Sequence, residues 1–338
     1  MYLSVAASRG VCGLWFRPFQ EMRGGLTGCP VAAEESGFSC LSGINPATGV
    51  WSTMNPFAKF GAVCRMIKIE HSVFALPFAY IGAFLAANGW PGLYSMVLLT
   101  LAMVGVRSFA MAVNRVVDLR YDAQNPRTQQ RPLVTGEISR AQTWAFIFIM
   151  AAIFVAACWG LNSLCFALSP LALCVAAVYS LLKRFTWLCH FWLGGVLALS
   201  PLAGWLAVDP QFTVTAALFA WGIVFWVAGF DIIYSCQDTA FDISVGLHSV
   251  PVRFGLPTAL VLSAFCHAIT AVMFLMGGWS AGLGWPYFLV WLGVSGVLLW
   301  EHSIISAEDM SRVNMAFFTL NGYVSVALYI GVLLGIWL

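Results

Sequence analysis

Charged residues are scarce in this chain of 338 amino acids. Lysine, arginine, aspartate and glutamate together make up 9% of it, whereas a soluble domain carries about a quarter. Hydrophobic residues make up 61%, and the formal net charge of +2 provides no basic face for a nucleic acid. These values exclude a soluble globular fold, a disordered chain and a nucleic-acid-binding protein. They predict an all-α polytopic membrane protein.

Paired cysteines are also missing. The ten cysteines stand singly, no CxxC motif occurs, and five of them lie within apolar runs: Cys158, Cys165, Cys174, Cys189 and Cys266. A cysteine in such a run is usually a small residue of the core. The sequence therefore gives no support for a disulfide framework or for a redox function.

Long stretches without charge predict the membrane spans. A spanning helix needs about 20 apolar residues, and charge-free stretches cover residues 72–106, 141–182, 185–208, 211–230, 254–300 and 313–338. Turn residues interrupt three of these stretches, at 88–92, 160–163 and 277–286. The sequence therefore predicts nine transmembrane helices.

Among the connections between the predicted helices, only alternate ones contain lysine or arginine. They precede the first helix and follow the second, fourth, sixth and eighth, whereas the opposite loops contain neither residue. By the positive-inside rule, the N-terminus and all the charged loops lie on the cytoplasmic side. Residues 1–55 lack both an uninterrupted apolar run and a basic, acid-poor composition. We interpret them as a disordered extension of a domain at 56–338, or as the result of a start assigned upstream of Met54.

Acidic residues gather in two stretches. At the end of the second helix, Asn114, Asp118 and Asp122 are spaced by four. Each step of four rotates by only about 40°, so the three side chains project along one side of the helix end. At the end of the sixth helix, Asp231 is followed by Asp238 and Asp242, which are again four apart.

These two stretches predict a metal site. They hold five of the 14 acidic residues, and lysine and arginine at helical spacing are too few to neutralise them all. Carboxylates beside hydrocarbon are costly and usually functional. An asparagine and four aspartates facing one another suit Mg²⁺, which completes its coordination with phosphates and water. Zinc is disfavoured because no histidine or cysteine pairs accompany the clusters. The expected ligand is a diphosphate held through the metal.

Four ordered motifs resemble one family. They are Asn114–Asp122, residues 125–132 with Asn125, Arg127 and Arg131, Tyr179–Thr186, and Asp231–Asp242 with the following Gly246–Ser249. Over residues 63–338 the chain resembles the UbiA superfamily of intramembrane aromatic prenyltransferases, in its branch similar to 4-hydroxybenzoate polyprenyltransferases. The resemblance implies nine helices around a central cavity open to the cytoplasmic face of the bacterial inner membrane. It also implies Mg²⁺-dependent transfer of a polyprenyl group from its diphosphate to a ring carbon of a hydroxylated aromatic acid, in ubiquinone or menaquinone biosynthesis.

Some positions depart from the family pattern. Arg115 follows Asn114 where aspartate is common, and Ser180 follows Tyr179 where proline is more usual. These differences resemble the subgroup associated with menaquinone synthesis by the futalosine route, whose acceptor is a carboxylated naphthol. The acceptor therefore stays open between 4-hydroxybenzoate and a carboxynaphthol, and the sequence leaves chain length and oligomeric state open as well.

The motifs assign roles to individual side chains. The expected Mg²⁺ ligands are Asn114, Asp118, Asp122, Asp238 and Asp242, and the four aspartates, with Asp231, form the catalytic set. Arg127, Arg131 and Lys183 are expected to contact the diphosphate, unless they are ordinary positive-inside charges. Arg184, Arg65 and Tyr179 are expected to bind the aromatic acceptor, with Arg184 gripping its carboxylate. Asp231 orients or deprotonates the phenol, or braces the metal ligands.

Arg107 is the one basic residue deep in an apolar stretch. It precedes Asn114 by seven residues, which is two helical turns, so it should face the same polar cavity and pair with an acidic residue there. A transporter is the alternative for nine helices with buried charges. A transporter, however, needs ionisable groups near the bilayer midplane, whereas these acids crowd at one membrane surface.

Overall fold

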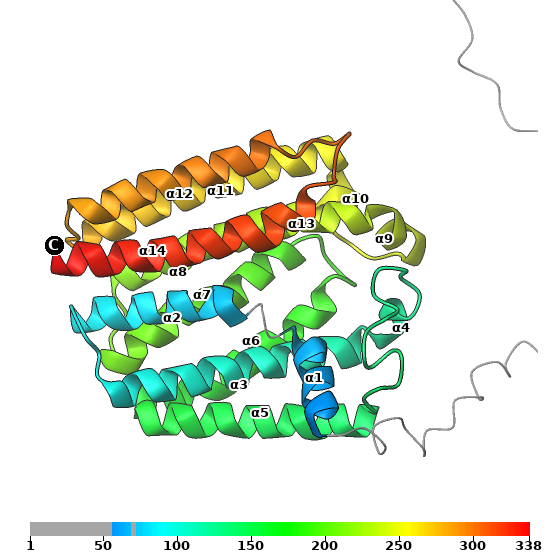
Figure 1. Ribbon diagram of the computed structural model, residues 1–338, viewed down its shortest axis with the longest axis horizontal. Helices are drawn as coiled ribbons and strands as arrows, with labels where there is room; N and C mark the ends of the chain where they lie inside the picture. Colours follow the sequence, from blue (N-terminus) through cyan, green and yellow to red (C-terminus); the bar gives the residue numbers. More distant parts are fainter. Residues whose placement is uncertain (1–55, 69–71) are drawn as a thin grey trace, which may run out of the picture. The chain divides into compact units, whose positions relative to one another are not determined.

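The computed structural model describes residues 56–68 and 72–338, in which every regular element is a helix (Figure 1). The expectations for residues 1–55 and for Met54 lie outside the described residues. The all-α class expected from the composition is confirmed for the part of the chain that is described.

Seven helical segments are long and apolar enough to cross a membrane. They are α3 (Leu93–Val117), α5 (Arg140–Leu161), α6 (Ser163–Leu182), α7 (Cys189–Val208), α8 (Val214–Ser235) with its continuation to Val245, α11 (Leu256–Ser280), and α14 (Asn321–Trp337) with the residues from Val313. Two further helices, α2 (Ser72–Ala87) and α12 (Trp285–Ser303), lie in the remaining charge-free stretches. α2 has only 16 residues, and the last turn of α12 contains Glu301 and His302. The described residues thus support seven spans, and the expected nine are not confirmed.

The turn residues of the sequence coincide with helix ends. α2 ends before the turn at 88–92, and α11 and α12 are separated by residues 281–284. Between α5 and α6, the Asn162 side chain accepts a hydrogen bond from the Cys165 amide and donates one to the Leu206 carbonyl oxygen at 2.7 Å. Asn162 therefore begins α6 and also ties that turn to α7.

Two glycines let α2 and α7 approach backbone to backbone. A Cβ on Gly82 would lie 2.0 Å from the carbonyl oxygen of Pro201, and one on Gly204 would lie 1.8 Å from that of Ala79. Membrane helices use small residues at such contacts because lipid provides no hydrophobic drive for association. α7 in turn packs along α8, so the position of α7 is fixed on both sides.

Aromatic residues fill the contact between α8 and its neighbours α11, α12 and α14. Trp226, Phe219, Phe274 and Tyr287 are fully buried there. The rings of Phe219 and Phe274 lie 6.0 Å apart, and the Trp226 ring lies 5.0 Å from that of Phe78 on α2. This packing holds α8 along its length, and so fixes the end at which its aspartates begin.

Short elements extend the long helices at one end. α4 (Leu119–Asp122) follows α3, and η3 (Cys236–Asp238), α9 (Thr239–Val245) and α10 (Val250–Phe254) follow α8. Figure 1 shows α4, α9 and α10 gathered at the same end of the helices. The other short elements are α1 (Pro56–Ile67), α13 (Val313–Met315) and the π-helical turn η4 (Ala316–Leu320). Both acidic stretches of the sequence therefore lie at this end.

Candidate active site

A cavity of about 250 Å³ lies between the ends of α3, α6, α7 and α8. Both acidic stretches line it. Most of the residues to which the sequence assigned a role contribute to its wall: Arg107, Asn114, Asp118, Asp122, Arg127, Arg131, Tyr179, Lys183, Arg184, Asp231, Asp238 and Asp242. Arg65 is not among the lining residues. It is exposed and pairs with Glu137 at 2.7 Å.

The first acidic stretch keeps helical hydrogen bonds across the junction of α3 and α4. The Asp118 amide donates to the Asn114 carbonyl oxygen at 2.9 Å, and the Asp122 amide donates to that of Asp118 at 2.8 Å. The Asn114 side-chain amide also donates to Asp118 Oδ2 at 2.7 Å. The spacing by four thus places all three side chains along one wall of the cavity.

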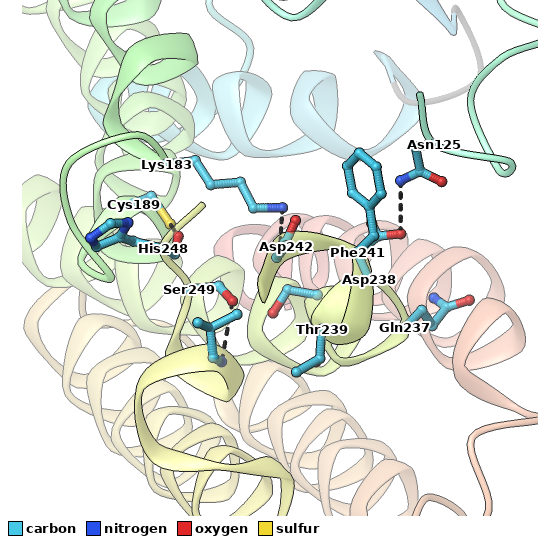
Figure 2. Close-up of polar contacts among 12 residues, drawn as sticks. Asn125, Lys183, Cys189, Gln237, Asp238, Thr239, Phe241, Asp242, His248 and Ser249 are labelled. Atoms are coloured by element: carbon cyan, nitrogen blue, oxygen red, sulfur yellow. Dashed lines mark hydrogen bonds and ion pairs between the residues drawn. The ribbon is translucent and has the colours of Figure 1, made fainter. Parts of the chain in front are cut away.

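The second acidic stretch meets the loop that follows the first. The Asn125 amide donates to Asp238 Oδ1 at 3.3 Å, and Arg127 donates to both oxygens of the same carboxylate. Asp242, one helical turn later, faces Lys183 at the end of α6 (Figure 2). Stretches far apart in the sequence therefore form one polar site.

Each of the four aspartates expected to hold the metal has its own basic partner. The pairs are Asp118 with Arg184 at 3.6 Å, Asp122 with Arg131 at 2.5 Å, Asp238 with Arg127, and Asp242 with Lys183 at 2.8 Å. The sequence predicted that basic residues at helical spacing would not neutralise all five aspartates, and in the structure four of the five have a lysine or arginine partner from other segments. Helical spacing does not reveal these partners because they come from the loop after α4 and from the end of α6.

The donor chemistry of this site fits Mg²⁺. Within the described residues, no three histidine, cysteine or acidic side chains form a ready-made metal cluster. The available donors are carboxylate and amide oxygens, and Mg²⁺ uses one or two carboxylates together with substrate phosphates. The basic partners match the oxygens of a diphosphate in the same way. The site therefore suits a metal that binds together with a phosphorylated ligand.

The charges at this end of the cavity influence one another. Burial, reinforced by the neighbouring carboxylate of Asp122, raises the pKa of Asp118 to about 6. At Lys183, burial lowers the pKa of the ammonium, but the adjacent Asp242 carboxylate outweighs it and raises the pKa above the usual value. Lys183 therefore stays charged, while Asp118 binds a proton more readily than an ordinary aspartate.

Arg184 is held beside the end of α3. Its guanidinium donates to the Val117 carbonyl oxygen at 2.6 Å and lies 5.2 Å from the centre of the Tyr121 ring. The guanidinium also forms the ion pair with Asp118, while its Nε atom is buried without a hydrogen-bond partner. Arg184 thus lines the acidic part of the cavity and is already engaged there.

Arg107 lies where the polar cavity meets an apolar one. The second cavity has a volume of about 320 Å³, is lined mainly by apolar residues of α3, α5, α6 and α7, and shares Arg107 and Leu197 with the first. The expected direction of Arg107 is thus observed. The expected ion pair is not found with any carboxylate of the described residues, and the Nε atom is buried without a hydrogen-bond partner. Arg107 presents an unpaired charge to the cavity.

Several cavity residues escaped the sequence reasoning. His190 is buried and contacts Asp231 Oδ2 through Nδ1 at 2.7 Å. Tyr234 accepts a hydrogen bond from Arg127 at 2.8 Å, and its ring packs at a tilt of 31° against that of Phe317, with ring centres 4.1 Å apart. The available signal for His190 was an ionisable residue next to an apolar run, which by default indicates a functional site in a membrane protein.

Comparison with known proteins gives one consistent result. The model of the UbiA prenyltransferase family matches residues 75–323. Two similar curated proteins are the 4-hydroxybenzoate octaprenyltransferases of Sodalis glossinidius and Klebsiella pneumoniae. They are 27% and 26% identical over 82% and 83% of this chain, and over 96% and 97% of their own.

Solved structures agree in fold. A UbiA homologue from Aeropyrum pernix K1, in its apo form, is 35% identical with a TM-score of 0.71, covering 78% of this chain and 97% of its own. A UbiA homologue from Archaeoglobus fulgidus, bound to GPP and Mg²⁺, has a TM-score of 0.63 at 20% identity, and the match covers 80% of this chain and 99% of the homologue. Both similarities extend over nearly the whole of the other protein.

Proposed function

Since the chain belongs to the UbiA prenyltransferase family, we propose that it transfers a polyprenyl group from its diphosphate to a ring carbon of a hydroxylated aromatic acid. It is a multi-pass membrane protein and a prenyltransferase. The observation that carries the proposal is the pairing of four aspartates with four basic residues around one cavity, next to an apolar cavity.

The acidic and basic residues divide the diphosphate site between them. Asp118, Asp122, Asp238 and Asp242 hold Mg²⁺, and Asn114 joins them once its Oδ1 leaves Arg115, which now donates to it at 3.2 Å. Arg127, Arg131 and Lys183 bind the phosphate oxygens. A Mg²⁺–diphosphate complex presents alternating charges, so it can exchange partners with the ion pairs without leaving any charge unpaired. The four ion pairs and the structure of the Archaeoglobus homologue with GPP and Mg²⁺ support this assignment.

The apolar cavity takes the first part of the polyprenyl chain. Its walls are formed by side chains such as Leu99, Met103, Phe154 and Leu168. Burying the chain there is favourable because each buried CH₂ contributes about 0.8 kcal/mol. The curated relatives named above are octaprenyltransferases, which supports a long chain as donor.

Arg107 binds the carboxylate of the aromatic acceptor. A half-buried guanidinium whose Nε atom is buried without a partner is costly, and a carboxylate ligand that accepts two parallel hydrogen bonds removes this cost. The position of Arg107 between the two cavities supports an acceptor beside the reacting end of the prenyl chain. Arg184 and Arg65 suit this role less well because both already have partners. Tyr179 lines the same cavity and contributes to the acceptor site.

Reaction begins when the allylic C–O bond breaks and its electron pair goes to the diphosphate. When bound, Mg²⁺ neutralises the charge that develops on this leaving group. Arg127, Arg131 and Lys183 stabilise the same oxygens, and the faces of Tyr234 and Phe317 stabilise the allylic cation. A ring carbon ortho to the phenol then attacks, and Asp231 accepts the phenol proton.

We also propose which aromatic acid is the acceptor and on which side of the membrane the site lies. The names of the curated relatives favour 4-hydroxybenzoate and ubiquinone biosynthesis, whereas Arg115 and Ser180 keep a carboxynaphthol and menaquinone as the alternative. The basic loops favour a site on the cytoplasmic face of a bacterial inner membrane. Nine spans result if α2 and α12 cross the bilayer as well.

One assay tests the function. Purified protein in lipid nanodiscs is incubated with Mg²⁺, a polyprenyl diphosphate and, in parallel, 4-hydroxybenzoate, a carboxynaphthol and non-phenolic benzoate. We expect a C-prenylated phenolic acid and free diphosphate, and no product with benzoate. EDTA and Asp238→Asn abolish the product, whereas Glu308→Gln, an exposed acidic residue outside the cavity, does not. Absence of product with every phenolic acid would overturn the proposal.

A further inference from the structure

We propose that His190 is a positioning residue, which holds Asp231 in the orientation and charge state that let it accept the phenol proton of the aromatic substrate. The inference rests on the proposed function and assigns a role to a residue that the sequence motifs do not contain. His190 lies at the start of α7, and Asp231 lies near the end of α8. The Nδ1 atom of His190 and the Oδ2 atom of Asp231 are 2.7 Å apart.

His190 and Asp231 differ in how far their side chains are exposed to the cavity. Both side chains line the cavity, but that of His190 is only 2% exposed, whereas that of Asp231 is 23% exposed. A ligand in the cavity therefore reaches the carboxylate readily and the imidazole hardly at all. His190 acts through Asp231.

The second contact of the imidazole fixes its tautomer. The backbone amide of Val250 donates a hydrogen bond to His190 Nε2 at 3.2 Å. An amide N–H can only donate, so Nε2 must present its lone pair and cannot carry a proton. The remaining imidazole proton is therefore on Nδ1, where it points at Asp231. His190 is a neutral donor to the carboxylate.

Asp231 differs from the four aspartates of the diphosphate site. Each of those has a lysine or arginine partner, whereas the partner of Asp231 is the neutral His190. The other titratable groups that line this part of the cavity are Tyr179 on α6 and Cys189, which precedes His190. No lysine or arginine of the described residues pairs with Asp231. Its negative charge is thus oriented but not neutralised, which suits a proton acceptor better than a metal ligand.

The step balances without any further reagent. As the ring carbon forms its bond to the allylic carbon, the phenol O–H bond breaks and its proton goes to the free oxygen of Asp231. The O–H electron pair becomes part of a C=O bond, which gives a neutral cyclohexadienone. The ring hydrogen next leaves as a proton, the oxygen regains one, and the aromatic phenol is restored. Asp231 returns its proton to water when the product leaves.

Two variants separate the two hydrogen bonds of His190. In His190→Asn the side-chain NH₂ takes the place of Nδ1–H and keeps the donor to Asp231, while the acceptor for Val250 is lost. In His190→Gln the longer side chain reaches Val250 with its oxygen, while the donor to Asp231 is lost. A purely structural role for His190 predicts no preference for the asparagine variant.

The second comparison uses two aromatic acceptors whose phenols differ in acidity. 3-Fluoro-4-hydroxybenzoate has a more acidic phenol than 4-hydroxybenzoate, so it depends less on a base for proton removal. With 4-hydroxybenzoate we expect His190→Gln to lower kcat by about 30-fold, within the contribution usual for general base catalysis, and to change both KM values by less than about threefold. We expect His190→Asn to keep kcat within about threefold. With the fluorinated acceptor, the loss in His190→Gln shrinks to less than about fivefold.

Several outcomes overturn the inference. Equal losses in the two variants, or the same loss with both acceptors, would show that His190 does not act on the phenol proton. If the glutamine variant does not fold, Asp231→Asn, which still accepts the His190 proton but cannot take up another, must show the same dependence on the acceptor.

A measurement independent of activity tests the tautomer. In ¹⁵N-histidine-labelled protein, the signals that disappear in His190→Asn must be those of a neutral ring protonated on Nδ1. Signals of an Nε2–H or a doubly protonated ring would contradict the assignment. If the wild type couples no phenolic acid, the proposed function fails, and this inference fails with it. A wild type that is active while the variants show no preference refutes only the role of His190.

Discussion

The Asn125 side chain donates a hydrogen bond to Asp238 Oδ1 at 3.3 Å, and this contact joins the loop after the first acidic stretch to the second. The same Asn125 accepts a hydrogen bond from the Arg127 amide through its own oxygen at 2.9 Å. Asn125 and Asp238 are both buried. One asparagine thus shapes the loop and positions a carboxylate that comes from another part of the chain.

Removing this contact should weaken diphosphate binding. In Asn125→Ala, Asp238 loses a buried hydrogen bond worth about 1.5–3 kcal/mol for a charged acceptor. We expect the KM for the prenyl diphosphate to rise by at least about tenfold, while the KM for the aromatic acid changes little. Gln129→Ala, an exposed position in the same loop, is the control. An unchanged KM in Asn125→Ala would mean that the loop is fixed by other contacts.

Arg107 should decide whether the acceptor needs a carboxylate. Arg107→Gln is expected to raise the KM for 4-hydroxybenzoate by about 10- to 100-fold, the effect of losing one charge-assisted contact. The methyl ester of the same acid, which has no negative charge, should show little difference between the variant and the wild type. Arg184→Gln should instead impair the prenyl diphosphate. A carboxylate-specific loss in Arg184→Gln, and not in Arg107→Gln, would exchange the two assignments.

Protons should compete with Mg²⁺ for Asp118. Burial and Asp122 raise the pKa of this carboxyl to about 6, so it becomes protonated as the pH falls below 6. An aspartate with an ordinary pKa would remain charged at that pH. Calorimetric titration of metal-free protein with Mg²⁺ and a non-hydrolysable diphosphate should show affinity decreasing between pH 7 and 5, at most about tenfold per unit. Asp118→Asn should bind weakly at both pH values. An affinity independent of pH would contradict the assignment of Asp118 as a ligand.

The same raised pKa has an opposite consequence for folding. The folded, metal-free protein binds the Asp118 proton more tightly than the unfolded chain does, so this group adds stability as the pH falls through about 6. Other groups titrate in this range, and the comparison is therefore the difference in unfolding midpoint between the wild type and Asp118→Asn at pH 7 and at pH 5. We expect the advantage of Asn over Asp to be larger at pH 7. A difference that does not vary with pH would show that burial does not disfavour the Asp118 charge.

The close contact of α2 with α7 should be sensitive to a single methyl group. A Cβ at position 204 would lie 1.8 Å from the Ala79 carbonyl oxygen, so Gly204→Ala forces the helices apart. Overpacking of this kind costs about 1–3 kcal/mol, and we expect a lower thermal unfolding midpoint. Gly195→Ala on the same helix has no atom within 4 Å of its new Cβ and should be neutral or stabilising. Equal midpoints for both variants would contradict the packing.

The apolar cavity should select the donor by length. Ala203 lines this cavity, and Ala203→Phe is expected to fill part of it. The KM for a long polyprenyl diphosphate should rise by about tenfold or more, whereas that for dimethylallyl diphosphate should change by less than about twofold, because only the long chain loses buried surface. Ala203→Val is the smaller matched change. Equal effects on both donors would place the chain elsewhere.

Much of the fold could be predicted because it depends on local patterns. The absence of charge over long stretches indicated the apolar helices, and turn residues at 88–92, 160–163 and 277–286 marked their ends. The spacing by four in Asn114, Asp118 and Asp122 predicted a shared wall because α3 stays almost helical to Asp122. The number of spans was harder to predict, since α2 is short and α12 contains polar residues.

The partners within the site could not be predicted in this way. The pairing of Arg127 with Asp238, and of Lys183 with Asp242, depends on how the loop after α4 and the end of α6 meet the end of α8. The contact of His190 with Asp231 depends on the packing of α7 against α8. A sequence shows which residues are charged, but the distance between residues on different helices is set by packing along the whole bundle.

The balanced ion pairs have a consequence for how the protein is made. Since the four aspartates already carry their own counter-ions, the unliganded site is close to electroneutral. The helices can therefore fold and pack in the bilayer before any divalent cation binds. Chelation of the metal should abolish activity without unfolding the protein.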